Sequence, residues 1–189
     1  SQELLKLIRD VIPQEPSIVI NVSGVCNIDV NYQEQLIDKH PYIWKYQEEL
    51  FENKKMKVKI NKKNRIRKIA YGLENKKSYA KWWVDDMRMM YAICTEFHIK
   101  YLAILQPNMY IGDYKITGLE HTSKNKEYPY KVRGWYEEVK KLIEDKKYII
   151  DFTNIYNGYK NIYWDTCHVY ENGNRIMAES VYQLIKDIL

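Results

Sequence analysis

The sequence of 189 residues predicts an α/β protein in which helices cover both faces of a parallel β-sheet. Helical stripes of apolar residues alternate along the chain with short apolar strands, the pattern typical of parallel sheets. The strands are rich in β-branched residues and end in turn-forming residues, which predicts that they are buried. The composition, 46% hydrophobic and 29% charged, is ordinary for a globular protein of one domain. We expect a single domain over residues 1–189.

The first helix and strand are predicted near the start of the sequence. Apolar side chains at helical spacing predict a helix over residues 3–12, and Pro13 ends it. Residues 17–22 are mostly β-branched and apolar, and Gly24 closes this run, so a buried strand is expected there.

The alternation continues in the second half of the chain. A helix is predicted over residues 78–97, a strand over 99–105, a helix over 131–145, a strand over 147–152 and a last helix over 173–188. The apolar side of helix 78–97 comprises Trp83, Val84, Met87, Met90, Tyr91 and Cys94. In a parallel sheet a ligand site lies beyond the carboxyl ends of the strands, so the segments after residues 22, 105 and 152 are the informative ones.

A basic insertion over residues 30–76 interrupts this alternation. A helix is predicted near 33–52, and Lys54–Lys68 is dense in lysine and arginine. The alternating apolar residues there favour a solvated β-hairpin or a flap, and a lid or a surface for an anionic polymer is the functional alternative. Nucleic acid is not the expected partner, because the basic residues have no aromatic stacking platforms among them and the net charge is only +5.

The cysteines and the hydropathy pattern exclude several classes of protein. Cys26, Cys94 and Cys167 form an odd set without a CxxC spacing, so no disulfide framework, structural zinc site or other metal or cofactor is expected. This cysteine usage slightly favours a reducing, cytoplasmic compartment. The sequence contains no run of about 18 apolar residues, so no membrane span is expected.

The strongest local signal is Asp165-Thr166-Cys167-His168, directly before the last predicted helix. A carboxylate three residues before a histidine on one loop can accept the Nδ1 proton and stabilise the imidazolium. Nε2 of His168 would then be available as a general base toward a hydroxyl. His40, His98 and His121 fall in no such spacing, nor in a metal-ligand spacing.

A second signal follows the first predicted strand, in Ser23-Gly24-Val25-Cys26-Asn27. Glycine allows close approach of a backbone N–H to a ligand, and an asparagine side chain can donate a second hydrogen bond. Gly24 and Asn27 are therefore candidate oxyanion donors, and a tight turn is the structural alternative. Cys26 is a weaker candidate nucleophile, and Ser23 lacks the flanking glycines of a nucleophile elbow and is expected to be structural.

Together these segments resemble the SGNH/GDSL hydrolase family. Gly24-Val25-Cys26-Asn27 corresponds to its strand followed by Gly-x-Asn-Asp, and Gln106-Pro107 to the end of its fourth strand. Asp165 and His168 correspond to its Asp-x-x-His block, and Gly173-Asn174 to the helix start behind it, with Ile176 and Ala178 continuing in register. The resemblance implies a flavodoxin-like three-layer α/β/α sandwich that hydrolyses esters or transfers acyl groups, with His168 and Asp165 as catalytic residues.

The sequence departs from the family pattern in two places. The Gly-Asp-Ser block with the nucleophile has no counterpart, so an N-terminal segment carrying the serine is expected on the parent gene or on a separate polypeptide. Cys26 stands where the family has its oxyanion asparagine, and Asn27 follows one residue later. We therefore expect Gly24 and Asn27 to share the oxyanion role.

The resemblance implies a serine esterase acting on small O-acyl esters. The aromatic residues of the predicted loops suit an acylated carbohydrate substrate; they are Tyr110, Tyr163, Trp164 and Tyr170. An O-acyltransferase acting on a polysaccharide, with the same catalytic residues, is the alternative enzyme. A non-catalytic carbohydrate-binding relative and an anionic-polymer binder working through Lys54–Lys68 are the alternatives outside enzymes.

Overall fold

The computed structural model describes residues 2–24, 78–118 and 120–186. Its main elements are α1 (Gln2–Lys6), β1 (Ile18–Ser23), α5 (Tyr79–Glu96), β2 (Lys100–Leu105), α6 (Tyr128–Ile143), β3 (Ile149–Asp151) and α7 (Glu171–Ile185). The predicted insertion at 30–76, with its helix near 33–52 and the basic Lys54–Lys68, lies outside the described residues. Cys26 and Asn27 lie outside them as well.

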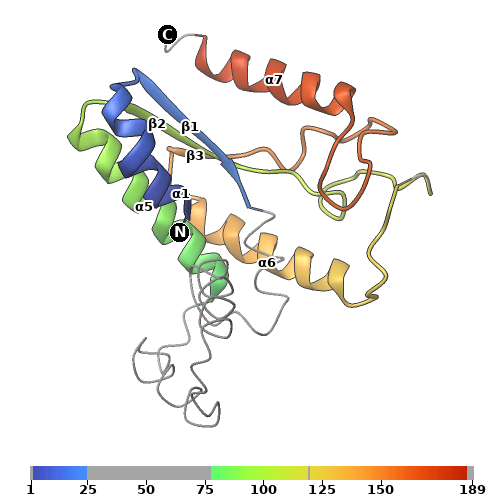
Figure 1. The fold of residues 1–189 in the computed structure, drawn as a ribbon. Coiled ribbons are helices and arrows are strands. Elements are labelled where there is room, and N and C mark those ends of the chain that lie inside the picture. Colours follow the sequence, from blue (N-terminus) through green and yellow to red (C-terminus); the bar gives the residue numbers. More distant parts are fainter. Residues whose placement is uncertain (1, 25–77, 119, 187–189) are drawn as a thin grey trace, which may run out of the picture.

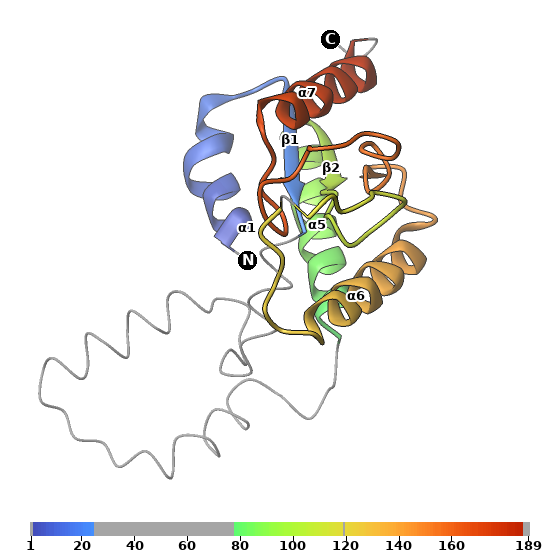
Figure 2. The same cartoon turned by 90° about the vertical axis from the view of Figure 1, so that its right-hand side faces the viewer.

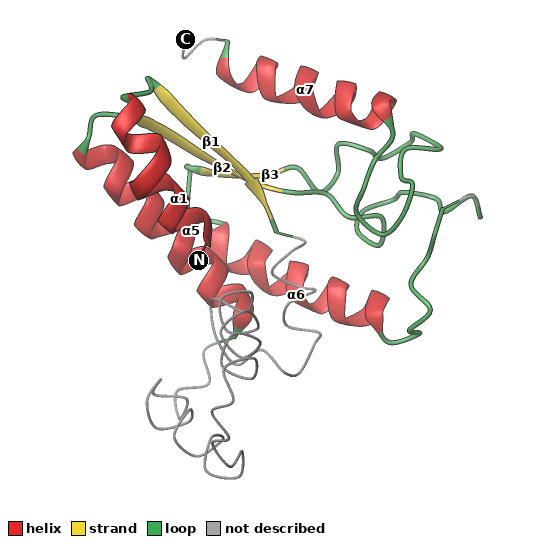
Figure 3. Cartoon of the chain, in the orientation of Figure 1, coloured by secondary structure: helices red, strands yellow, loops and turns green. Residues whose placement is uncertain are grey.

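Within the described residues, three parallel strands form the sheet, in the order β1-β2-β3. Ile18 to Ser23 pair with Lys100 to Leu105, and the last three residues of β2 pair with Ile149 to Asp151. Helices α5 and α6 lie on one face of the sheet and α7 lies on the other (Figures 1 and 3). The predicted α/β class with a parallel sheet is confirmed.

Helix α5 supplies much of the core beneath the sheet. The side chain of Ser78 caps its N-terminus by accepting a hydrogen bond from the backbone N–H of Lys81 at 3.2 Å. Its buried residues recur at helical spacing and are Ala80, Trp83, Val84, Asp86, Met87, Met90 and Cys94. The prediction placed Tyr91 on this face, but Tyr91 is exposed and stacks on Tyr148 at a ring distance of 4.2 Å. Tyr91 therefore lies just outside the buried stripe of the helix, on its surface side.

The predicted continuous helix at 3–12 is wrong in its second half. Helix α1 ends at Lys6, a π-helical turn covers Leu7–Val11, and a 3-10 turn covers Ile12–Gln14. Pro13 has no N–H to donate to the carbonyl of Arg9, so an α-helical ladder cannot continue through it. Glu15 then adopts a left-handed conformation, with φ of 50°, and the chain turns toward β1.

Helix α6 and strand β3 also differ from their predicted bounds. Helix α6 begins at Tyr128 rather than at 131, because Pro129 is tolerated in the first turn, where no N–H is needed. Strand β3 is shorter than the predicted 147–152. The N–H of Ile149 donates to the carbonyl of Lys146, so the chain turns directly before the strand, and the carbonyl of Tyr148 accepts the N–H of Ala103 in β2 at 2.8 Å.

All three strands end at the same edge of the sheet, at Ser23, Leu105 and Asp151. The loops at 106–127 and 152–170 gather at this end, toward the viewer in Figure 2. A ligand site of a parallel sheet is expected at this edge.

No helix of the described residues combines the length and apolar character that crossing a membrane requires.

Gly173, in the first turn of α7, allows this helix to pack closely on the loop before it. A side chain added at Gly173 would lie 2.7 Å from Cβ of Val169 and 2.9 Å from Cγ2 of Ile162. The Tyr156 hydroxyl also donates to the Gly173 carbonyl at 3.0 Å. The contact therefore has no room even for a methyl group, whereas Gly134, in α6, has no atom within 4 Å of such a position.

We predict that Gly173→Ala lowers the free energy of unfolding by about 1–3 kcal/mol, because an added methyl must displace packed neighbours. The matched change in an open helix position, Gly134→Ala, should raise it by about 0.5–1 kcal/mol, because alanine loses less backbone entropy. Urea denaturation of both variants measures the difference. Equal effects of the two substitutions would contradict the packing of α7 described above.

Candidate functional site

A short antiparallel hairpin at residues 162–170 carries the Asp-x-x-His motif. Tyr163 pairs with Val169. The N–H of Trp164 donates to the carbonyl of His168 at 2.9 Å, and the N–H of Tyr170 donates to the carbonyl of Ile162 at 2.8 Å. The backbone on both sides of the tip, residues 165–167, is thus tied together by hydrogen bonds.

Tyr163 anchors this hairpin in the core, with only 1% of its surface exposed. Its ring packs edge to face against the rings of Tyr114 and Tyr156, with 4.9 Å and 5.5 Å between ring centroids, respectively. Such perpendicular aromatic pairs are favourable beyond the area they bury. They join the 106–127 and 152–170 loops into one packed unit that supports the hairpin.

The tip of the hairpin is also held from outside. The N–H of His121 donates to the carbonyl of Trp164 at 2.8 Å, and the N–H of Met109 donates to the carbonyl of Thr166 at 3.4 Å. Both donors lie in the loop that follows β2. The tip therefore has backbone partners on a second segment, which fixes its position relative to the end of the sheet.

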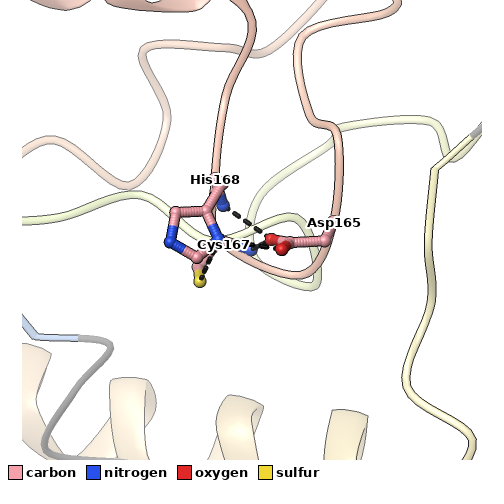
Figure 4. Close-up of side chains that lie close together, drawn as sticks. All are labelled: Asp165, Cys167 and His168. Atoms are coloured by element: carbon pink, nitrogen blue, oxygen red, sulfur yellow. Dashed lines mark hydrogen bonds and ion pairs between the residues drawn. The ribbon is translucent and has the colours of Figure 1, made fainter.

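Asp165 and His168 form a hydrogen-bonded dyad at this tip, as the sequence predicted (Figure 4). Oδ2 of Asp165 lies 2.8 Å from Nδ1 of His168. Oδ1 of Asp165 accepts the backbone N–H of Cys167 at 2.9 Å and that of His168 at 2.8 Å. Aspartate favours a local turn in which its carboxylate accepts hydrogen bonds from the backbone N–H groups two and three residues ahead. One spacing thus produces both the turn and the ring contact.

The electrostatics keep Asp165 ionised. Partial burial alone would raise the pKa of Asp165, but the N–H groups of Cys167 and His168 and the His168 ring outweigh burial, and the pKa lies below its usual value. An ionised carboxylate can only accept at Oδ2, so Nδ1 carries the proton. Nε2 of His168 points away from Asp165 (Figure 4), and the side chain is 73% exposed. This nitrogen has the orientation of an accessible general base.

Cys167 lies beside the dyad without completing a metal site. Asp165, Cys167 and His168 offer ligand atoms within 4.8 Å of one another. Sγ of Cys167 is 3.7 Å from Nδ1 of His168, the nitrogen that Asp165 already holds. A cation bound by all three residues would have to displace the hydrogen bond of the dyad, so the arrangement fits proton transfer better than metal binding.

Gly24 lies at the C-terminal end of β1, with φ of 142°, a conformation that favours glycine. Atoms of Leu105, Gln106 and Tyr136 are the nearest to a side chain placed there, at 3.4–3.7 Å, and none belongs to the dyad. Ser23 before it is buried and accepts a hydrogen bond from the Trp83 indole at 3.0 Å. Its burial and this hydrogen bond agree with the predicted structural role, while Asn27, the other predicted oxyanion donor, lies outside the described residues.

Comparison of the chain with protein-family models, with curated proteins and with solved structures gives no match. Any functional assignment therefore depends on the geometry of the dyad and on the residues around it.

A buried carboxylate, Glu120, supports the hairpin and was not predicted from the sequence. Glu120 is 6% exposed and accepts hydrogen bonds from the Tyr114 hydroxyl at 2.6 Å, from Thr117 and from the N–H of Gly118 at 3.0 Å. The Tyr114 hydroxyl in turn accepts the N–H of Ile162 at 3.2 Å. This chain of hydrogen bonds links the loop after β2 to the base of the hairpin. No local pattern indicates it, because 42 residues of sequence, from 120 to 162, separate its two ends.

Two side chains at the strand ends position their own loops. Asp151 accepts the N–H of Thr153 at 2.8 Å and lies 3.3 Å from the Lys140 ammonium. Asn108 is fully buried and accepts the N–H of Tyr110 at 3.0 Å. Burial, rather than any pattern in the sequence, reveals the role of Asn108.

The predicted carbohydrate-facing aromatic residues must be corrected. Tyr110 and Tyr163 are buried and belong to the core. Trp164 and Tyr170, on the same hairpin, are exposed. His121, which falls in no catalytic or metal-ligand spacing, is exposed and contacts Trp164, with 6.3 Å between ring centroids.

We predict that Glu120 stabilises the fold most strongly at neutral pH. Burial alone would raise the pKa of Glu120, but hydrogen bonds from Tyr114 and Thr117 hold it below the ordinary value of 4.5. A carboxyl group with a depressed pKa contributes stability above its unfolded pKa and loses it as the pH falls through the folded value. Glu120→Gln should therefore destabilise by about 1–3 kcal/mol near pH 7 and by less near pH 4.

Urea denaturation at both pH values measures this difference. Glu127→Gln removes an exposed carboxylate of the same loop, paired with Lys131 at 3.6 Å, and controls for the loss of one charge. A deficit in Glu120→Gln that is independent of pH would contradict an ionised, hydrogen-bonded Glu120.

Proposed function

We propose that this chain carries the acid–base part of an SGNH/GDSL-type serine esterase that hydrolyses small O-acyl esters. The observation that carries the proposal is the 2.8 Å contact between Nδ1 of His168 and Oδ2 of Asp165, with Nε2 exposed on the opposite side of the ring. A buried neighbour on the hairpin, Tyr163, fixes the backbone of the dyad. An oriented, accessible imidazole of this kind is what activation of a hydroxyl nucleophile requires.

The chemistry follows from the two ring nitrogens. Nε2 of His168 accepts the proton of a serine hydroxyl as its oxygen attacks the acyl carbonyl, and then gives this proton to the leaving alcohol. In the second half, Nε2 accepts a proton from water, which attacks the acyl-enzyme, and returns a proton to the serine. Asp165 remains ionised throughout and stabilises the imidazolium, in keeping with its lowered pKa.

We assign the developing oxyanion to the end of β1. The backbone N–H of Gly24 and the side chain of Asn27 are the proposed donors, since the strand ends at the edge of the sheet where the hairpin also lies. The φ of 142° at Gly24 is a conformation that a residue with a side chain rarely adopts.

The nucleophilic serine is proposed to come from a segment that adds strands to the sheet beside β1. Within the described residues β1 pairs with β2 alone. Its apolar side chains from Ile18 to Ile20 are only half-buried and Val22 is 44% exposed, whereas Ile104 and Leu105 of β2 are fully buried. A β-branched strand of this kind is typical of the inside of a parallel sheet. A further strand paired with β1, on the side away from β2, would complete the proposed three-layer α/β/α sandwich of flavodoxin-like type.

We predict that His168→Ala lowers kcat/KM for an aryl acetate by roughly four orders of magnitude or more, and Asp165→Asn by about as much, when the serine-bearing segment is supplied. His168→Ala removes the base, and Asp165→Asn destabilises the imidazolium and the productive tautomer. Initial rates with a chromogenic ester measure both effects, and full activity in His168→Ala would refute the assignment.

Cys167→Ser serves as the matched control on the same loop. The hydrogen bond from the backbone N–H of residue 167 to Asp165 is retained in this variant. The thiol of Cys167 lies on the Nδ1 side of the His168 ring, away from the proposed path of the proton at Nε2. This variant should keep activity within about threefold of the unmodified chain. A loss as large as that of His168→Ala would indicate a thiol enzyme instead.

The position of the nucleophile is a separate prediction. A fluorophosphonate probe should label a serine of the supplied segment and leave Ser23 unlabelled, because Ser23 is buried and bonded to Trp83. Peptide mapping by mass spectrometry locates the label. Labelling of Ser23, or of the chain without the added segment, would contradict the proposed origin of the nucleophile.

A further inference from the structure

Trp164 and His168 occupy facing positions on the 162–170 hairpin. The N–H of Trp164 donates to the carbonyl of His168, and the next pair along the hairpin is Tyr163 with Val169. Facing residues of an antiparallel pair project to the same side, and adjacent pairs project to opposite sides. The Trp164 and His168 side chains are exposed, whereas Tyr163 is buried and Val169 is half-buried. The indole and the proposed general base therefore share the outer side of the hairpin.

Trp164 combines a fixed backbone with an exposed side chain. Its N–H and its carbonyl are both bonded, to His168 at 2.9 Å and to the N–H of His121 at 2.8 Å. The side chain is nevertheless 54% exposed, with the His121 ring at its edge at an interplanar angle of 69°. Exposed tryptophan on a rigid backbone loses little conformational entropy on binding, which is the property of an aromatic binding platform.

The surroundings of the indole favour a carbohydrate over an acyl chain. A pyranose ring presents an apolar C–H face that covers a flat aromatic ring, and hydroxyl groups at its rim that need polar partners. His121, whose ring lies at the edge of the indole, is exposed and polar, and Asp165 follows Trp164 in the chain. An acyl chain would instead require a concave apolar pocket. The platform thus suits the alcohol part of an ester when that alcohol is a sugar.

We propose that Trp164, with His121 at its edge, is the subsite for a sugar ring whose O-acyl group is the substrate of the His168 centre. The assignment of the acyl group rests on the proposed esterase function, whereas the binding of the sugar does not. A sugar stacked on the indole lies on the same side of the hairpin as His168. Its esterified hydroxyl is then the leaving alcohol that receives the proton from Nε2.

The test is a titration of the 189-residue chain with oligosaccharides, followed by the indole N–H signals in NMR spectra. The probes are xylotetraose, cellotetraose and chitotetraose, each with and without O-acetyl groups. Trp164→Phe assigns the Trp164 signal. We expect at least one of these sugars to shift that signal in a saturable manner, without any requirement for the serine-bearing segment.

Two alanine variants distinguish a specific binding platform from non-specific binding to exposed aromatic residues. Trp164→Ala should weaken binding about tenfold or more, because it removes the stacking surface. Phe97→Ala removes an aromatic ring of nearly equal exposure, 56% against 54%, at the end of α5 and therefore at the opposite edge of the sheet. It should leave the affinity unchanged.

The outcomes separate this inference from the esterase proposal. A saturable shift that is lost in Trp164→Ala and kept in Phe97→Ala supports the subsite. Binding of none of the sugars, or unchanged affinity in Trp164→Ala, overturns it. If sugar binding fails while His168→Ala still abolishes hydrolysis of an aryl acetate, the esterase stands without a carbohydrate platform. If sugars bind while His168→Ala keeps its activity, the chain binds carbohydrate without the proposed chemistry.

Discussion

Three strands that run parallel need connections that return the chain to the opposite edge of the sheet each time, and these connections are α5 and α6. Every strand therefore ends at one edge, and the polypeptide that follows each strand gathers there (Figure 1). The proposed site depends on this constraint. The end of β1 with Gly24 and the hairpin with the dyad lie far apart in sequence, yet both are delivered to that edge.

Loops are usually poor supports for catalytic groups, and this one is reinforced by aromatic and polar packing. Tyr163 is enclosed by Tyr114 and Tyr156, and the Tyr114 hydroxyl lies between Glu120 and the N–H of Ile162. Burial of these rings excludes water from the base of the hairpin, which strengthens the hydrogen bonds within it. The abundance of tyrosine in this chain, 18 residues, is thus partly explained by the need to hold long loops in place.

Two carboxylates with lowered pKa values have different tasks in this arrangement. For both, burial opposes ionisation and hydrogen-bond donors outweigh it. Glu120 is nearly inaccessible, and its donors are two hydroxyls and backbone N–H groups of its own loop, so it stabilises structure. Asp165 is 32% exposed and contacts a titratable ring whose other nitrogen is accessible, so it can assist proton transfer. The hydrogen-bond partner of the carboxylate, rather than the lowering of its pKa, distinguishes the catalytic candidate Asp165 from the structural Glu120.

The sequence by itself determined the α/β class, the order of the described α-helices and strands, and the contact within the dyad. These features depend on short-range regularities: apolar periodicity selects helix or strand, and the spacing of Asp165 and His168 closes a turn of four residues. Tertiary structure alone decided which aromatic residues are core and which are surface. Tyr163 and Trp164 are adjacent and chemically alike, but one is 1% and the other 54% exposed. Their difference arises from tertiary contacts: Tyr163 packs against Tyr114 and Tyr156, and Trp164 contacts the His121 ring at its edge. Tyr114 and His121 are distant in sequence from the hairpin, and no local pattern encodes such contacts.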